Sequence, residues 1–194
     1  MNKIRLSIIE DKIKVETPYN EEFVTRSRNL RGKWEDGAWW FDDTIIDYVR
    51  ELMLSCFGTT GESPYEECDL IVKDFTGYGA CAPVKLFGRT IAYAHGRNSG
   101  AKLGEDIVFI SGEYGSGGST KNWRTEVRNA TFIIKGVPCP SITMSDVKAA
   151  IEAGWCEVKY PNKKRKPEEI QADIDKHNTV LAELKKELED AQRS

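Results

Sequence analysis

The chain has 194 residues, of which 40% are hydrophobic and 30% charged, and its formal net charge is −3. The length suits one compact domain with an appendage or two small domains, and the composition excludes a wholly disordered chain. No apolar run reaches about 18 residues, which excludes a membrane-spanning helix, and the small net charge does not indicate a nucleic-acid or membrane surface over the whole protein.

The first predicted elements are two short strands in residues 3–16. Apolar and polar side chains alternate there on both sides of a turn at Glu10-Asp11, which is the pattern of half-buried strands. Asn20 is placed to cap a helix over residues 21–30, whose first turn is acidic, as the helix dipole favours. Gly32 is expected to end that helix.

A hairpin and a second helix are predicted next. Residues 33–41 are β-type around Asp36-Gly37, a residue pair that favours a tight turn. Asp42 or Asp43 then caps a helix over residues 44–56, in which apolar residues recur at helical spacing. These elements make an N-terminal strand–helix–hairpin–helix module, which we place at residues 1–58.

The middle of the chain predicts a β-rich domain at residues 66–160. Residues 76–125 contain ten glycines, and short strands joined by glycine turns indicate a small sheet, sandwich or barrel-like unit. A short helix over residues 147–153 and a last strand over residues 155–160 are expected to follow. The predicted strands of this domain before that helix are residues 68–73, 84–87, 90–94, 107–110 and 131–134.

The C-terminal region predicts a linker and a coiled-coil helix. Residues 161–167 contain two prolines and four basic residues, and are predicted to be the linker. Residues 168–194 then show an a/d heptad repeat, which is typical of a coiled coil and favours a homodimer. The alternative is that this apolar stripe packs within the chain on the helix of residues 44–56. The stripe consists of Ile170, Ile174, His177, Leu181, Leu184 and Leu188.

The predicted fold class is therefore α+β. It combines the N-terminal strand–helix–hairpin–helix module, a β-rich and glycine-containing middle, and the C-terminal coiled-coil helix. The apolar run at the N-terminus is too short for a signal peptide, so the protein is expected to stay in the cytoplasm of the host cell, with no contact to a membrane.

Residues suited to catalysis or metal binding are few. The five cysteines are odd in number and irregularly spaced, and only two histidines occur, so neither a disulfide framework nor a zinc site is predicted. We expect reduced, mostly buried thiols, no metal and no cofactor. The run Gly112–Gly118 does not meet the phosphate-loop pattern and is predicted to be a loop between strands. No catalytic residue is identified, and the alternative is an unrecognised enzyme that uses His95 with the glycine-rich loops.

Residues 85–135 are a basic segment in an acidic chain. Their net charge is +4, whereas residues 1–84 carry −6. Cations and aromatic rings beside glycine-rich loops suit a phosphate backbone with stacked bases, although acidic residues in the same segment leave an ordinary mixed surface as the alternative. Trp39 and Trp40 must point to opposite faces of a strand, and Trp39 is the predicted contact residue of the two. The other predicted nucleic-acid or partner contacts are Arg89, Arg97, Lys102, Lys121, Trp123 and Arg124.

The segment from Val15 to Leu54 contains ETPYNEEFV and then NLRGKWEDGAWWF. It resembles a small module of uncharacterised phage and mobile-element proteins, and more distantly the HARP domain of annealing helicases, which recognises DNA forks. The resemblance implies a DNA-contacting module, but the acidic balance of this segment opposes tight DNA binding there. The matching positions are Tyr19, Phe23, Leu30, Gly32, Trp34, Trp39 or Trp40, and Phe41.

The predicted function is that of a non-enzymatic accessory protein, encoded by a phage or mobile element, that binds a host protein or ribonucleoprotein complex. The chain is similar, as a class, to anti-CRISPR inhibitors of host defence, which are commonly small, acidic and without enzymatic motifs. Its acidic N-terminal half suits competition with nucleic acid for a basic groove. The alternative is direct binding of single-stranded or forked DNA by the basic segment and an exposed tryptophan, which salt would weaken.

Overall fold

A computed structural model describes residues 3–160 and eight separate positions between Gln171 and Lys185. In this part of the chain eleven strands form three sheets, and all of their pairings are antiparallel. The predicted α+β class with a terminal coiled coil is therefore wrong, because long antiparallel strands dominate the described chain and the last helix with defined ends is at Ser145–Glu152. No described helix is both long and apolar enough to cross a membrane.

The first sheet has the strand order β1-β2-β4-β3. Its strands are β1 (Arg5–Ile9), β2 (Lys12–Glu16), β4 (Ala38–Asp42) and β3 (Lys33–Glu35). Alternation places Leu6 opposite Val15 and Ile13 opposite Phe41 on one buried face, as the sequence pattern of these strands predicts. The inward residues of both strand pairs thus build one side of a first hydrophobic core.

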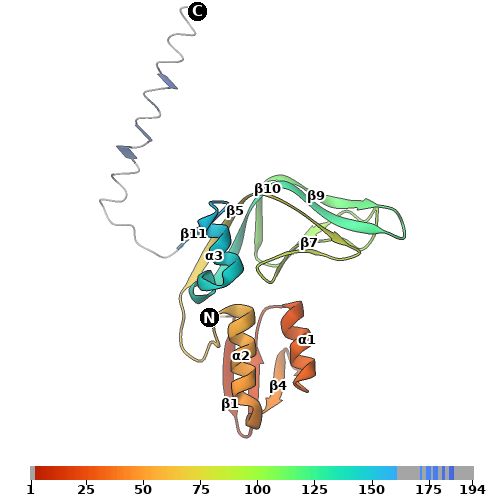
Figure 1. The fold of residues 1–194 in the computed structure, drawn as a ribbon, viewed down its shortest axis with the longest axis vertical. Helices are drawn as coiled ribbons and strands as arrows, with labels where there is room; N and C mark the ends of the chain where they lie inside the picture. Colours follow the sequence, from red (N-terminus) through yellow and green to blue (C-terminus); the bar gives the residue numbers. More distant parts are fainter. Residues whose placement is uncertain are drawn as a thin grey trace, which may run out of the picture. The chain divides into compact units, whose positions relative to one another are not determined.

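Two helices supply the other side of this core. They are α1 (Glu21–Asn29) and α2 (Ile46–Phe57), which lie beside β1 and β4 in Figure 1. The predicted cap of α1 is confirmed, since Asn20 Oδ1 accepts a hydrogen bond of 3.0 Å from the backbone N–H of Phe23. Asp42 instead caps a 3-10 turn, η1 (Asp43–Ile45), which leads directly into α2.

The second sheet has the strand order β11-β5-β10-β9 and contains the longest strands of the described chain. A third, smaller sheet has the order β6-β7-β8. The inward faces of both sheets and helix α3 form a second hydrophobic core around Phe132. The remaining elements are β5 (Glu67–Ala80), β6 (Val84–Leu86), β7 (Arg89–Tyr93), β8 (Lys102–Leu103), β9 (Ile107–Gly118), β10 (Trp123–Pro138), η2 (Cys139–Thr143), α3 (Ser145–Glu152) and β11 (Cys156–Lys159).

The glycine-rich run predicted to be a loop is part of a strand. Gly112–Gly118 forms the second half of β9, which pairs with β10 up to Trp123. The reason lies in contacts that are distant in sequence. A Cβ atom on Gly117 would stand 2.8 Å from a carboxylate oxygen of Glu126, so glycine makes room for that side chain on the neighbouring strand.

The coiled-coil prediction is wrong for the part of the C-terminal region that the structure describes. Of its predicted stripe, Ile174, His177, Leu181 and Leu184 are described, and all four are exposed. A narrow stripe buries its apolar side chains only against a partner helix, and the apolar side chains of Ile174, Leu181 and Leu184 are about half exposed. The predicted linker, residues 161–167, lies outside the described residues, as do Ile170 and Leu188.

Gly58 ends α2 and packs closely on η2, which joins the first core to the second. Its φ is +68°, and a Cβ atom there would lie 2.8 Å from Ser141 Cα. The hydroxyl of Ser141 donates a hydrogen bond of 2.5 Å to the carbonyl oxygen of Phe57. A side chain at position 58 would therefore strain the backbone and also displace Ser141.

We expect Gly58→Ala to lower the free energy of unfolding more than Gly100→Ala does, by about 1–3 kcal/mol. Both glycines have positive φ, but a Cβ atom on Gly100 would have no neighbour within 4 Å. Gly100→Ala therefore costs roughly 1–2 kcal/mol for holding alanine at positive φ, and adds no steric clash of the kind that a Cβ atom on Gly58 makes with Ser141. Urea denaturation of the two variants checks this, and equal losses would contradict close packing between Gly58 and Ser141.

Candidate nucleic-acid interface

The candidate interface lies on the distal arm, which we define as residues 75–80 of β5, residues 95–103 from the β7–β8 connection through β8, and residues 111–130 of β9, β10 and the turn between them. Figure 1 shows β9 and β10 running together away from α3, with β7 along the same arm. Thr125 is buried, and its hydroxyl donates to the Ala82 carbonyl at 2.8 Å and accepts from the Ala94 N–H at 3.1 Å. The third sheet thus covers the inner face of the arm, and the outer face is open to solvent.

The outer face displays a charged row beside an aromatic ring. Arg124 and Arg128 both bind Glu126, which lies between them on β10. The hydrogen bond from Arg124, aided by the positive charge of both guanidinium groups, holds the pKa of the Glu126 carboxyl below its usual range. Tyr78 stands opposite Glu126 on β5 and is 75% exposed. Gly115 stands opposite Glu126 on β9, so no β9 side chain shields Glu126 itself, while Glu113 stands opposite Arg128.

Three loops meet at the end of the arm and bring predicted contact residues together. The Cys81 N–H donates to the Trp123 carbonyl at 2.9 Å, and the Cys81 thiol lies 3.6 Å from the Lys121 carbonyl. The Ser116 hydroxyl donates to the Arg97 carbonyl at 2.8 Å, which holds the β7–β8 connection against β9. These contacts fix the main-chain positions of Arg97, Lys121 and Trp123. The side chains of Arg97 and Lys121 are exposed.

The cations of the arm differ in how far their charge is compensated. Arg97, Lys102 and Lys121 are exposed and have no ion pair with any residue that the structure describes. Arg124 shares the carboxylate of Glu126 with Arg128. On the arm, the predicted set therefore contributes three uncompensated cations and one that is partly neutralised.

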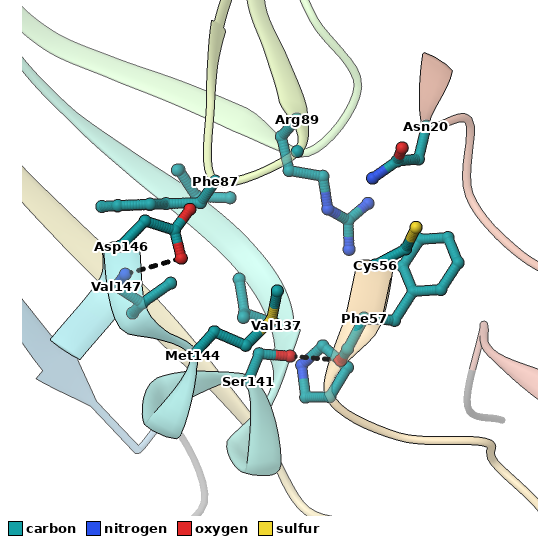
Figure 2. Close-up of a pocket in the computed structure, with 13 residues that line it drawn as sticks. Asn20, Cys56, Phe57, Phe87, Arg89, Val137, Ser141, Met144, Asp146 and Val147 are labelled. Atoms are coloured by element: carbon teal, nitrogen blue, oxygen red, sulfur yellow. Dashed lines mark hydrogen bonds between the residues drawn. The ribbon is translucent and has the colours of Figure 1, made fainter. Parts of the chain in front are cut away.

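Arg89, which was predicted in the same set, lies apart from the arm. It is half-buried at the start of β7 and lines a cavity of about 20 Å³ together with Asn20, Cys56 and Phe57. Figure 2 shows its guanidinium directed toward the end of α2. Burial there lowers the pKa of Arg89 from its ordinary value. This arginine faces the junction between the two cores and not the solvent.

The prediction of Trp39 as an outward contact is wrong. Trp39 is 5% exposed, because α1 covers its face of the sheet, and its ring contacts Phe23 and Phe41. Trp40 is half-buried on the opposite face, where Lys14 lies over its ring. The exposed tryptophan is Trp34, which pairs with Trp39 from the edge strand β3. Its exposure follows from the position of β3 at the edge of the sheet, which the sequence alone does not show.

The structure gives His95 no partner of the kind that general base catalysis requires. The imidazole is exposed and contacts the ring of Tyr93 at 5.4 Å between centroids. Within the described residues it contacts neither a carboxylate nor a thiol, and no group of three potential metal ligands comes together. The alternative of an enzyme built on His95 therefore receives no support from its surroundings.

The thiols divide into three buried groups, the half-buried Cys139 and one exposed group. Cys56, Cys68 and Cys156 are buried, whereas Cys81 is exposed at the end of the arm. Burial raises the pKa of Cys68 to about 12 and that of Cys156 to about 11. These two thiols stay protonated, and hence unreactive, at neutral and mildly alkaline pH.

We expect Ellman's reagent at about pH 8 to modify Cys81 rapidly and to reach Cys68 and Cys156 only when the protein unfolds, because the thiolate is the reactive form. The measurement is the number of thiols that react before and after adding denaturant. Cys81→Ser should remove the fastest phase. A fast phase of unchanged size in that variant would contradict the assignment.

Comparison of the chain with protein-family models, with curated proteins and with solved structures finds no match. The resemblance of residues 15–54 to the HARP domain therefore stays a prediction. A function for this chain must be inferred from the geometry of the arm and of the N-terminal module.

Proposed function

We propose that the protein is a non-enzymatic binding protein whose distal arm contacts single-stranded nucleic acid. The observation behind this proposal is the trio of exposed cations, Arg97, Lys102 and Lys121, that have no acidic partner in the described chain. They stand on an arm that also presents the exposed ring of Tyr78. Cations that bind phosphates and rings that stack on bases are the two components of single-strand binding sites.

The shape of the outer face favours a single strand over a duplex. Gly117 and Gly115 on β9 stand opposite Arg124 and Glu126, so a strand can lie along this part of the sheet without meeting large side chains on β9, whereas Glu113 stands opposite Arg128. Direct readout of a duplex uses a helix or a narrow β-ribbon inserted in the major groove. The three-stranded face offers instead a surface on which unpaired bases can stack.

A second candidate is an accessory protein of a phage or mobile element that binds a host nucleic-acid-handling or defence complex, as an anti-CRISPR inhibitor does. The acidic surface of the N-terminal module favours it, since this surface could occupy a basic groove. The exposed acidic residues without an ion pair in the described chain include Glu10, Asp11, Glu35, Asp36 and Asp43. In this account the arm contacts the nucleic acid of the complex and the module contacts its protein.

The test is fluorescence anisotropy with a labelled oligothymidylate of about 20 nucleotides, a duplex and a fork, which suffices for a site of roughly 4–16 nucleotides. We expect the single strand to bind most tightly and its affinity to fall as salt rises from about 50 to about 200 mM, because binding releases counterions. No binding to any of the three at the lower salt would refute the direct proposal. The pull-down of a nucleoprotein complex from host lysate would then test the second candidate.

A further inference from the structure

The N-terminal module has a groove of about 860 Å³ that is distinct from the arm. Tyr19, in the connection between β2 and α1, forms part of its wall and is 64% exposed. Trp34, on the edge strand β3, is 56% exposed and also lines the groove. Arg28, in the last turn of α1, contributes a guanidinium to the same surface. Two large rings that face solvent beside a cation are unusual on a surface without a partner.

The Trp34 ring is held in place by the core beneath it. It packs edge-on against Trp39, with 5.6 Å between centroids, and Trp39 stacks in turn on Phe41. Gly32 brings the chain close to this cluster, since a Cβ atom there would stand 2.4 Å from the Phe41 ring. A ring that is already fixed in its bound position costs little entropy when a ligand binds.

The groove offers hydrogen-bond donors and one cation to a ligand. Lys14 pairs with Glu16 at 3.0 Å, and Lys3 pairs with Glu105 at 3.6 Å, so both carboxylates of the lining are already compensated. Arg28 has no acidic partner in the described chain. The Tyr19 hydroxyl and the Trp34 indole N–H make no hydrogen bond with any described residue. A ligand that supplies acceptors and a negative charge therefore matches these groups.

We infer that this groove binds an extended, proline-containing peptide segment of a partner protein, with an acidic side chain of that peptide on Arg28. A polyproline II segment presents carbonyl acceptors to solvent, its prolines lack N–H donors, and its rings fit between exposed aromatic side chains. The charge complementarity rests on one residue, since Arg28 is the single uncompensated cation among the described lining residues.

A polyanion is a poorer match for the same groove. The β3–β4 hairpin that presents Trp34 also presents Glu35 and Asp36, both exposed and without an ion pair in the described chain. Their negative charge would repel a phosphate backbone but would tolerate a peptide with one carboxylate. The groove thus gives the protein a peptide-binding function in addition to the nucleic-acid contact proposed for the arm, and does not depend on that contact.

The test measures binding of a fluorescein-labelled Pro-Pro-Leu-Pro-Pro-Glu peptide to the full chain by anisotropy, and of its glutamine counterpart. We expect Trp34→Ala and Tyr19→Ala each to weaken binding of the acidic peptide at least about tenfold, because stacked aromatic contacts provide most of such an affinity. Arg28→Gln should weaken the acidic peptide and leave the glutamine peptide unchanged. Tyr48→Ala, which removes a ring that is 63% exposed on α2 outside the groove, is the matched control and should bind both peptides normally.

Circular dichroism spectra of all variants, and Trp34→Phe as a variant that keeps an aromatic ring, separate loss of the site from loss of the fold. The inference is overturned if neither peptide binds the wild-type chain at about 1 mM, the weak end of measurable specific affinities. It is also overturned if Trp34→Ala weakens oligothymidylate binding and not peptide binding. Failure of the arm proposal has a different signature, since oligothymidylate binding is then absent while peptide binding persists.

Discussion

Replacing Phe132 with alanine is expected to lower the free energy of unfolding by about 3–5 kcal/mol, the usual cost of removing a buried phenylalanine ring. Phe132 is fully buried in the middle of β10. Its strand neighbours are Val72 on β5 and Phe109 on β9, and its ring meets Phe75 edge-on at 5.7 Å. Deleting the ring leaves a cavity where two sheet neighbours and an aromatic contact converge, and the paired backbone of three strands limits how far it can collapse.

The measurement is urea denaturation, and Ile133→Ala is the matched control. Ile133 is the next residue on the same strand, but it points to the outer face and is half-buried. Its truncation is expected to cost about 1 kcal/mol, because solvent can fill the space that the side chain leaves. Equal losses in the two variants, or a larger loss for Ile133→Ala, would show that the core does not lie on the Phe132 side of the sheet.

Elements that depend on nearby residues were predictable from the sequence. The alternation in residues 3–16 gave β1 and β2, and Asn20 caps α1 as expected because a cap contacts only the N–H groups of the following turn. Two properties of β9 and β10 were not predictable in this way, namely their length and the strand conformation of the glycine-rich run. Their length depends on partners distant in sequence, such as Gly117 opposite Arg124. A glycine-rich run looks like a loop until the neighbouring strand is known.

The candidate site was predicted in part for the same reason. The basic segment identified the cations of the arm by composition, which does not require knowledge of pairing. Alternation showed that Trp39 and Trp40 face opposite ways, but only the position of α1 decides which face is covered, and that position buries Trp39. Trp34 became visible as the exposed ring only when β3 proved to be an edge strand.

The C-terminal heptad shows where periodicity stops being informative. Spacing identifies a stripe of apolar residues, but the burial of a stripe depends on a second surface that the spacing does not specify. In the described chain Ile174, Leu181 and Leu184 are exposed. The stripe therefore does not support the predicted coiled coil, whereas the cations of the arm and the rings of the groove are positioned by pairing and packing that the structure shows directly.

Reversing the three uncompensated charges of the arm, with Arg97→Glu, Lys102→Glu and Lys121→Glu combined, is expected to weaken oligothymidylate binding by at least about 100-fold, because it removes the attraction of three cations and adds repulsion. Each cation that lies about 4 Å from a phosphate contributes roughly 1 kcal/mol in water, so three contribute about 3 kcal/mol, and about 1.4 kcal/mol corresponds to tenfold. The salt dependence should also become shallower, by about 0.7 for each phosphate of a single strand that the variant no longer neutralises. Anisotropy titrations at several salt concentrations measure both quantities.

The matched control changes the same amount of charge elsewhere, with Lys12→Glu, Lys33→Glu and Lys135→Glu combined. These lysines are exposed, have no ion pair in the described chain and lie outside the distal arm. If the arm is the contact surface, the control variant should lose only the small part of the oligothymidylate affinity that comes from net charge. The reason is that exposed charges farther away than about 10 Å are screened at moderate salt. Equal weakening in both triple variants would mean that binding follows net charge alone, and the arm would then have no special part in it.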